Sequence, residues 1–229
     1  MEKQQNSVYS SFMFLKLQPE FRKLVSNEKI AAKQEFEGMV AACQEKIFLR
    51  TYMLAGLRAD ADLLFWRMSD DLAYLQDICA RTFSAGAGRY FTAAHSYLGV
   101  YHPPLDQEPK DLEFGFLPKN AFGRHRYMLL HPVIKANNWY ELPSAEREKM
   151  MAERAAVIAG HGDINENFFF SYGLDDQEMI VEREAPTLAG LVAATKELRR
   201  LRIKTYTLLD KPVFLCLGRD LREIMDAIS

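Results

Sequence analysis

The order of hydrophobic and polar positions is the same in the two halves of the chain. Apolar runs typical of β-strands cover residues 9–17, 47–54, 61–68, 94–101, 126–134, 165–172, 177–182 and 212–217. Apolar residues recur at helical spacing over 27–46, 69–83, 143–160, 187–200 and 220–228. Each half therefore predicts the order β-α-β-β-α-β, and a short helix follows at the end of the chain.

A short motif supports a duplication. Gly56-Leu57 is followed by Asp60 and Asp62, and Gly173-Leu174, 117 residues later, is followed by Asp175-Asp176. A repeated β-α-β-β-α-β unit predicts an α+β fold made of two ferredoxin-like units. Each sheet would carry helices on one face, so we expect the other faces to pack into a dimeric-α/β-barrel-type core. Chance similarity between two α+β halves is the alternative interpretation.

A change in composition separates the two halves. Residues 102–123 are rich in Pro, Gly and charged residues, which is typical of a connecting segment. We therefore expect an N-terminal ferredoxin-like half at 1–101 and a C-terminal ferredoxin-like half at 124–229.

The composition argues against several classes of protein. The 29 Lys and Arg residues against 31 Asp and Glu give a net charge of -2, without the basic excess typical of nucleic-acid binding. Apolar runs fall far short of the ~20 residues of a membrane span, and the N-terminus lacks the apolar core of a signal peptide. Cys43, Cys79 and Cys216 form no CxxC pair, which argues against disulfides and thiolate metal sites. We expect a soluble cytoplasmic protein without a metal site, a membrane partner or a nucleic-acid partner.

Several short motifs occur together along the chain. In the second half they are His131-Pro132-x-x-Lys135, Trp139-Tyr140, Arg147-x-x-x-Met151, Gly173-Leu174-Asp175-Asp176 and Asp210-Lys211-Pro212-Val213-Phe214. In the first half they are Phe14-Leu15-Lys16, Gly56-Leu57-Arg58 and His95-Ser96-Tyr97-Leu98. With these motifs the chain resembles the chlorite dismutase family, which includes the coproheme decarboxylases of bacterial haem synthesis. The resemblance covers nearly the whole chain.

This resemblance implies a fold, an assembly and a cofactor. The fold is the duplicated ferredoxin-like one, and the assembly is a homo-oligomeric ring, for which we expect a homopentamer. The cofactor would be haem b or coproheme, bound in the second half by an axial His on the helix that begins near Ser144. Lys135, Trp139 and Tyr140 would border its propionates.

The chain departs from the family's pattern at three positions of the haem pocket. The axial His falls on Arg154, or on its neighbour Glu153 when the position is counted back from Gly173, and neither is a histidine. The protonated guanidinium of Arg154 offers only hydrogen-bond donors and cannot ligate iron as imidazole does. The Arg of chlorite-degrading members falls on Glu166, where a carboxylate would repel chlorite, and the Tyr of coproheme decarboxylases falls on His131. His161, two helical turns beyond Arg154, is either a substitute axial ligand or a solvent-facing turn residue between two glycines.

Arg154 lies among apolar residues of its predicted helix, and two interpretations of it stay open. It pairs with an acidic neighbour, or it receives the carboxylate or phosphate of a ligand in the former haem pocket. A third interpretation, in which Arg154 is buried without a partner, is excluded because an unpaired buried cation costs too much free energy.

Three hypotheses about function follow from the resemblance and the departures. The first is a haem-linked oxidoreductase of the peroxidase type with altered or lost haem ligation, not a true chlorite dismutase. The second is a haem-free, non-enzymatic oligomeric scaffold or partner subunit. The third is a binder of another anionic small molecule through Arg154, Lys135 and His131. The three departures together favour the second and third hypotheses, so the cofactor is haem b, coproheme or none.

Overall fold

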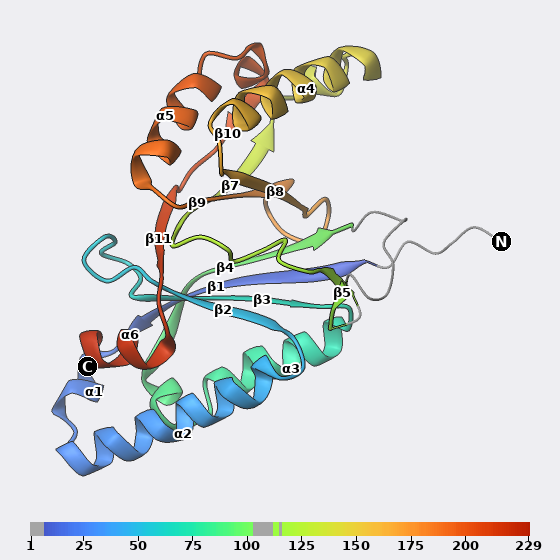
Figure 1. Cartoon of the computed structure of the whole chain (residues 1–229). Coiled ribbons are helices and arrows are strands. Elements are labelled where there is room, and N and C mark those ends of the chain that lie inside the picture. Colours follow the sequence, from blue (N-terminus) through green and yellow to red (C-terminus); the bar gives the residue numbers. More distant parts are fainter. Residues whose placement is uncertain (1–6, 103–111, 115) are drawn as a thin grey trace. The chain divides into compact units, whose positions relative to one another are not determined.

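The computed structural model describes residues 7–102, 112–114 and 116–229, which form two compact units (Figure 1). The first unit holds the described residues up to Phe122 together with Leu217–Ser229, and the second holds Gly123–Cys216. Residues 103–111 and 115 of the connecting segment expected at 102–123 lie outside the described residues. No helix in the described part of the chain has both the length and the apolarity that a membrane span requires.

The first unit consists of an antiparallel sheet and helices. Its main elements are β1 (Val8–Leu17), α1 (Pro19–Lys23), α2 (Ser26–Gln44), β2 (Phe48–Met53), β3 (Leu63–Ser69), α3 (Leu72–Thr82), a 3-10 helix (Gly86–Tyr90), β4 (Phe91–Tyr101), the short pair β5 (Leu112–Glu113) and β6 (Leu117–Pro118), and α6 (Leu221–Ile228). The larger strands lie in the order β2-β3-β1-β4, with Phe12 opposite Trp66 and Tyr97. This order is that of a ferredoxin-like unit.

The helices α2 and α3 cover one face of this sheet (Figure 1). Phe36 of α2 lies in the core between the helices and the sheet. Its ring centroid is 5.9 Å from the ring centroids of Phe65 on β3 and Phe91 on β4. The 3-10 helix lies between the predicted helix at 69–83 and the predicted strand at 94–101. A Cβ on Gly88 would lie 1.8 Å from the backbone oxygen of Thr82, so only glycine allows this close approach.

The C-terminal helix α6 belongs to the first unit, whereas we expected residues 220–228 to be part of the C-terminal half. Its apolar face packs into the core of the first unit through Leu221, Ile224, Met225 and Ile228. The strand β11 (Phe214–Gly218) leads into this helix, and Leu217 pairs with Met53 of β2. Burial of an apolar helix face therefore determines the unit to which the segment belongs.

The second unit repeats the same arrangement. Its elements are β7 (Tyr127–Lys135), a 3-10 helix (Asn137–Trp139), α4 (Ser144–Gly160), β8 (Asn165–Phe170), β9 (Met179–Ala185), α5 (Leu188–Leu198), a second 3-10 helix (Arg202–Tyr206) and β10 (Thr207–Leu209). The antiparallel strands lie in the order β8-β9-β7-β10, and α4 and α5 cover one face of them (Figure 1). The predicted α+β class with two ferredoxin-like units is thus confirmed.

Two local features differ from the sequence prediction. The helix predicted to begin at residue 69 begins at Leu72, because Ser69 is the last residue of β3. Asp71 caps this helix: its Oδ1 accepts a hydrogen bond from the Tyr74 N–H at 3.1 Å. In the second unit β7 lies between β9 and β10. The sequence predicted no strand at β10, where Thr207 lies opposite Lys135. The predicted closing strand at 212–217 is β11.

Candidate functional site

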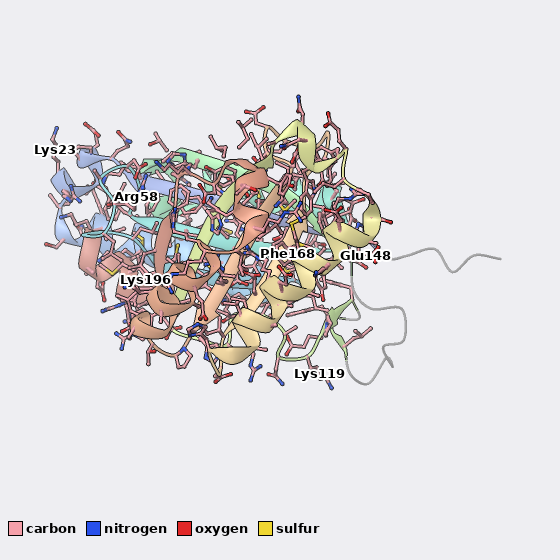
Figure 2. The ribbon with its side chains drawn as sticks, turned by 90° about the horizontal axis from the view of Figure 1, so that it is seen from above. Lys23, Arg58, Lys119, Glu148, Phe168 and Lys196 are labelled. Atoms are coloured by element: carbon pink, nitrogen blue, oxygen red, sulfur yellow. The ribbon has the colours of Figure 1, made fainter. Side chains whose placement is uncertain are left out.

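The second unit contains a cavity of about 300 Å³ between its sheet and its helical layer. Alternate residues of a strand point to the same face, so β7, β8 and β9 each present a row of side chains to this space. Most of the wall is apolar and includes Leu129, Val133, Phe168, Met179 and Val181. Figure 2 shows the helical layer from above, with Glu148 labelled on α4 and Lys196 on α5.

A buried ion-pair network lies at this cavity. Arg154 of α4 donates from Nε and Nη2 to the two carboxylate oxygens of Glu166 on β8, at 2.7 and 2.6 Å. Arg183 of β9 donates from Nε to Glu166 Oε1 at 2.5 Å and from Nη1 to Thr195 Oγ1 at 3.0 Å. The side chains of Arg154, Glu166 and Arg183 are 15%, 6% and 5% exposed. One carboxylate therefore balances two guanidinium groups, and the network keeps one surplus positive charge.

The two arginines differ in what else holds them. The Arg154 guanidinium also lies 5.4 Å from the centroid of the Phe168 ring, within the range of a cation–π contact. Burial lowers the pKa of Arg183, and its carboxylate partner opposes that shift. The network gives Arg154 the acidic neighbour of the first interpretation, which is Glu166, twelve residues further along the chain.

Lys135 is a buried lysine at the end of β7, 7% exposed, whose side chain lines the cavity. Its Nζ lies 4.3 Å from the centroid of the Trp139 ring, and its backbone N–H donates to Glu178 Oε2 at 2.7 Å. Within the described residues, no carboxylate forms an ion pair with this ammonium group. Burial, with the positive charges of Arg154 and Lys204, lowers the pKa of Lys135 to about 8.

His131 of β7 is a buried imidazole in the same wall, 8% exposed. Its Nδ1 has no hydrogen-bond partner in the described structure. Burial, with the positive charges of Arg183 and Arg154, lowers the pKa of His131 to about 3. The side chain is therefore neutral at physiological pH.

The charges around the cavity are unequal. Five cationic side chains line it, namely Lys135, Arg154, Arg183, Arg199 and Lys204. Asp210 is the carboxylate of the lining, and it forms an ion pair with Lys204. Even with Glu166 counted, the positive charges are in excess. An apolar cavity with this excess suits a ligand that has an apolar body and an acidic group.

The structure brings together most of the site residues predicted from the sequence. His131, Lys135, Trp139 and Arg154 line the cavity, and Glu166 joins them through its ion pairs. The other two predicted residues do not line it.

Tyr140 and His161 lie outside the cavity. Tyr140 is 44% exposed, and its hydroxyl donates to that of Tyr172 at 3.4 Å. His161 is the C-cap of α4, and its Nε2 lies 2.5 Å from Glu197 Oε2. Its position at the end of α4 agrees with the turn residue of our second interpretation and places its imidazole away from the lining.

Sequence reasoning missed Arg183, Lys204 and Asp210. Arg183 could have been found, because it continues the alternation of Met179 and Val181 on the strand we ended at residue 182. Asp210 begins one of the motifs that carry the resemblance, but the motif alone did not place it at the site. Lys204 lies in a segment without a hydrophobic period, so only the tertiary structure places it. Among the described residues, no group of three or more His, Cys, Asp or Glu side chains could hold a metal ion.

The neutral His131 makes the protein sensitive to acid. Its folded-state pKa of about 3 lies below the ordinary 6.5, so the unfolded chain takes up this proton first. Stability therefore rises with pH between about 3 and 6.5 and is lost as the pH falls through that range. At pH 5 this loss amounts to about 2 kcal/mol for one histidine.

We expect His131→Gln to remove this part of the acid sensitivity. Urea unfolding at pH 7.5 and pH 5 should show that the wild type loses about 2 kcal/mol more than the variant between the two conditions. His161→Gln, a change outside the cavity, is the control and should behave as the wild type. Equal losses in the wild type and His131→Gln would contradict a neutral, buried imidazole.

Comparison with known proteins relates this geometry to a family. The family described as chlorite dismutase matches residues 29–219 of the chain. The chain is similar to the coproheme decarboxylase of Mycolicibacterium smegmatis, with 28% identity over 166 residues, 71% of this chain and 69% of that protein. It is also similar to the chlorite dismutase of Ideonella dechloratans, with 25% identity over 193 residues, 80% of this chain and 66% of that protein.

A solved structure has the same fold. A mutant of chlorite dismutase from Candidatus Nitrospira defluvii matches with a TM-score of 0.84 and 21% identity, over 98% of this chain and 96% of that chain. A likeness at this identity concerns the fold, and a fold does not determine the activity. The function must therefore be argued from the cavity itself.

Proposed function

The chain belongs to the chlorite dismutase family, and we propose that it is a haem-free member whose second unit binds an organic anion. The anion would occupy the cavity lined by Lys135 and Arg154. The observation that carries the haem-free part of the proposal is the direct ion pair between Arg154 and Glu166, with two hydrogen bonds of 2.7 and 2.6 Å.

The residues present do not fit a haem bound in the manner of the family. The resemblance places the axial ligand at Arg154 and the group on the opposite side of the iron at Glu166. A haem would have to lie between these two side chains, which instead contact each other. The guanidinium is a donor and not a ligand, and separating it from Glu166 would leave buried charges without their partners.

An anion fits the same residues. The excess of cations around the cavity requires a negative charge, and Lys135 has no carboxylate partner within the described residues. Apolar side chains such as Val133 and Phe168 would contact the rest of the ligand. A carboxylate or phosphate on an apolar body therefore satisfies both the charge and the wall.

Two titrations test this function. We expect hemin and coproheme to give no saturable Soret shift at sub-micromolar concentration. We expect benzoate at about ten times its Kd to stabilise the protein by about 1.4 kcal/mol, which raises Tm by about 3–6 °C. Benzamide, which has the same shape and no charge, is the matched ligand control and should act more weakly.

Variants of two lysines complete the design. Lys135→Met should lose the benzoate effect, whereas Lys196→Met, on the exposed side of α5, should keep it. A Soret band that saturates at one haem per chain would contradict the haem-free proposal. Equal effects of benzoate and benzamide would contradict the anion site.

A haem-linked oxidoreductase is the second candidate, and one observation favours it. His131 is the imidazole of the described cavity lining, and its Nδ1 lacks a hydrogen-bond partner. Imidazole is an ordinary haem ligand. Under this candidate the hemin titration would give a Soret band, and His131→Gln would abolish it.

A further inference from the structure

We propose that Lys135 acts as a nucleophile and forms an imine with an aldehyde or ketone group of the anion bound in the cavity. The inference rests on the proposed anion-binding function and adds the chemical class of the ligand, a carbonyl compound with an acidic group. It also assigns to Lys135 a covalent step rather than a purely electrostatic contact.

The surroundings of Lys135 differ from those of other lysines in the protein. Lys204, which lines the same cavity, is paired with Asp210, and Lys16 is paired with Asp62 at 2.9 Å. Lys135 instead extends over the face of Trp139 towards the cavity. No described carboxylate forms an ion pair with the Lys135 amine, which lies at the cavity where a bound carbonyl group could reach it.

Burial and neighbouring cations favour the neutral, reactive form of the amine, and the contact with the Trp139 ring opposes them by favouring the ammonium. Only the neutral amine attacks a carbonyl carbon, and burial beside other cations is a recognised means of populating it. Arg154 and Lys204 supply the neighbouring positive charges, and Glu178, which opposes them, accepts the backbone N–H of Lys135. With a pKa of about 8, about half of the Lys135 side chains are neutral at pH 8.

The reaction is a balanced condensation. The nitrogen lone pair of Lys135 attacks the carbonyl carbon, and the resulting carbinolamine loses water. The C–O bond breaks, the oxygen leaves with the two amine hydrogens, and a C=N bond remains. No oxidant or reductant takes part. The cations that remain at the cavity balance the acidic group of the ligand.

Reductive trapping tests the proposal. The wild-type chain is incubated at pH 8 with 4-carboxybenzaldehyde and sodium cyanoborohydride, which reduces the imine to a stable secondary amine. Intact mass followed by peptide mapping should show one adduct per chain, at Lys135. We expect labelling of Lys135 to be at least about tenfold faster than that of the exposed Lys196, because more of the buried amine is neutral.

Three controls separate the imine from simple anion binding. Benzaldehyde, which lacks the carboxylate, should label Lys135 more slowly. Benzoate should protect Lys135 from labelling in the wild-type protein, a result that depends on no variant. Lys135→Arg keeps the charge, so it should retain benzoate stabilisation and lose the adduct. The labelling rate of the wild type should rise with pH, with a midpoint near 8.

The possible outcomes are distinguishable. Stabilisation by benzoate together with labelling of Lys135 no faster than that of Lys196 would overturn the imine and leave the proposed function intact. Neither stabilisation nor selective labelling would overturn both. Selective labelling that benzoate prevents would support both.

Discussion

The variant Glu166→Gln is expected to lose about 3–5 kcal/mol of its free energy of unfolding. Glu166 is the carboxylate that both Arg154 and Arg183 contact, at 2.6 and 2.5 Å, and all three side chains are largely buried. Glutamine keeps the shape of the side chain but removes the charge. Two buried guanidinium groups then face each other without a counter-charge, and urea unfolding at pH 7.5 measures the loss.

A surface pair in the same unit provides the matched control. Arg202 and Glu146 lie 3.3 Å apart with side chains 60% and 47% exposed, so Glu146→Gln should change the stability by less than about 1 kcal/mol. The double variant Arg154→Met with Glu166→Gln should lose less stability than the sum of the two single variants, because Arg154 and Glu166 bond to each other and both single variants remove the same ion pair. A loss below 1 kcal/mol for Glu166→Gln would contradict a structural role for the network.

The order of elements in both units could be predicted from the sequence. Strands such as 126–134 and helices such as 143–160 have a clear hydrophobic period, and the structure places β7 and α4 within one residue of those bounds. A hydrophobic period shows which face of a helix or strand is buried, and it can be recognised within the residues of that element alone. The repeat of the whole pattern then predicted the ferredoxin-like order twice.

Features that depend on distant partners could not be predicted. Residues 207–209 have no strand period of their own and form β10 because they pair with β7. The helix at 220–228 was recognised, but the core that receives its apolar face belongs to the first unit. In both cases the local sequence pattern does not indicate which strand or core the segment will contact. Only tertiary packing determines that contact.

The candidate site shows the same division. The sequence indicated Arg154 and Glu166 separately, each as a departure from the family's pattern. That the two side chains bond to each other follows from the position of α4 above β8, which no local pattern contains. Arg183, the third member, was missed because we ended its strand at residue 182.

We expect Arg154→His to melt earlier than the wild type and to gain no Soret band with hemin. The imidazole would lie beside Glu166, which loses two of its three hydrogen bonds to guanidinium groups and keeps the one from Arg183. This corresponds to about 2–4 kcal/mol, smaller than the loss for Glu166→Gln because one partner remains. For a chain of this size Tm should fall by about 4–16 °C.

Glu153→His is the matched control for Arg154→His, because it adds a histidine at the neighbouring exposed position of α4. This control measures how much hemin binds to an added histidine at an exposed position. It should leave Tm nearly unchanged. If hemin binds Arg154→His no better than Glu153→His, the missing axial imidazole is not the only feature of the pocket that excludes haem. A Soret band with sub-micromolar affinity in Arg154→His alone would mean that the pocket still accommodates haem and lacks only its axial ligand. The claim that the residues of this pocket exclude haem would then be wrong, since a single imidazole would have restored haem binding despite the carboxylate of Glu166.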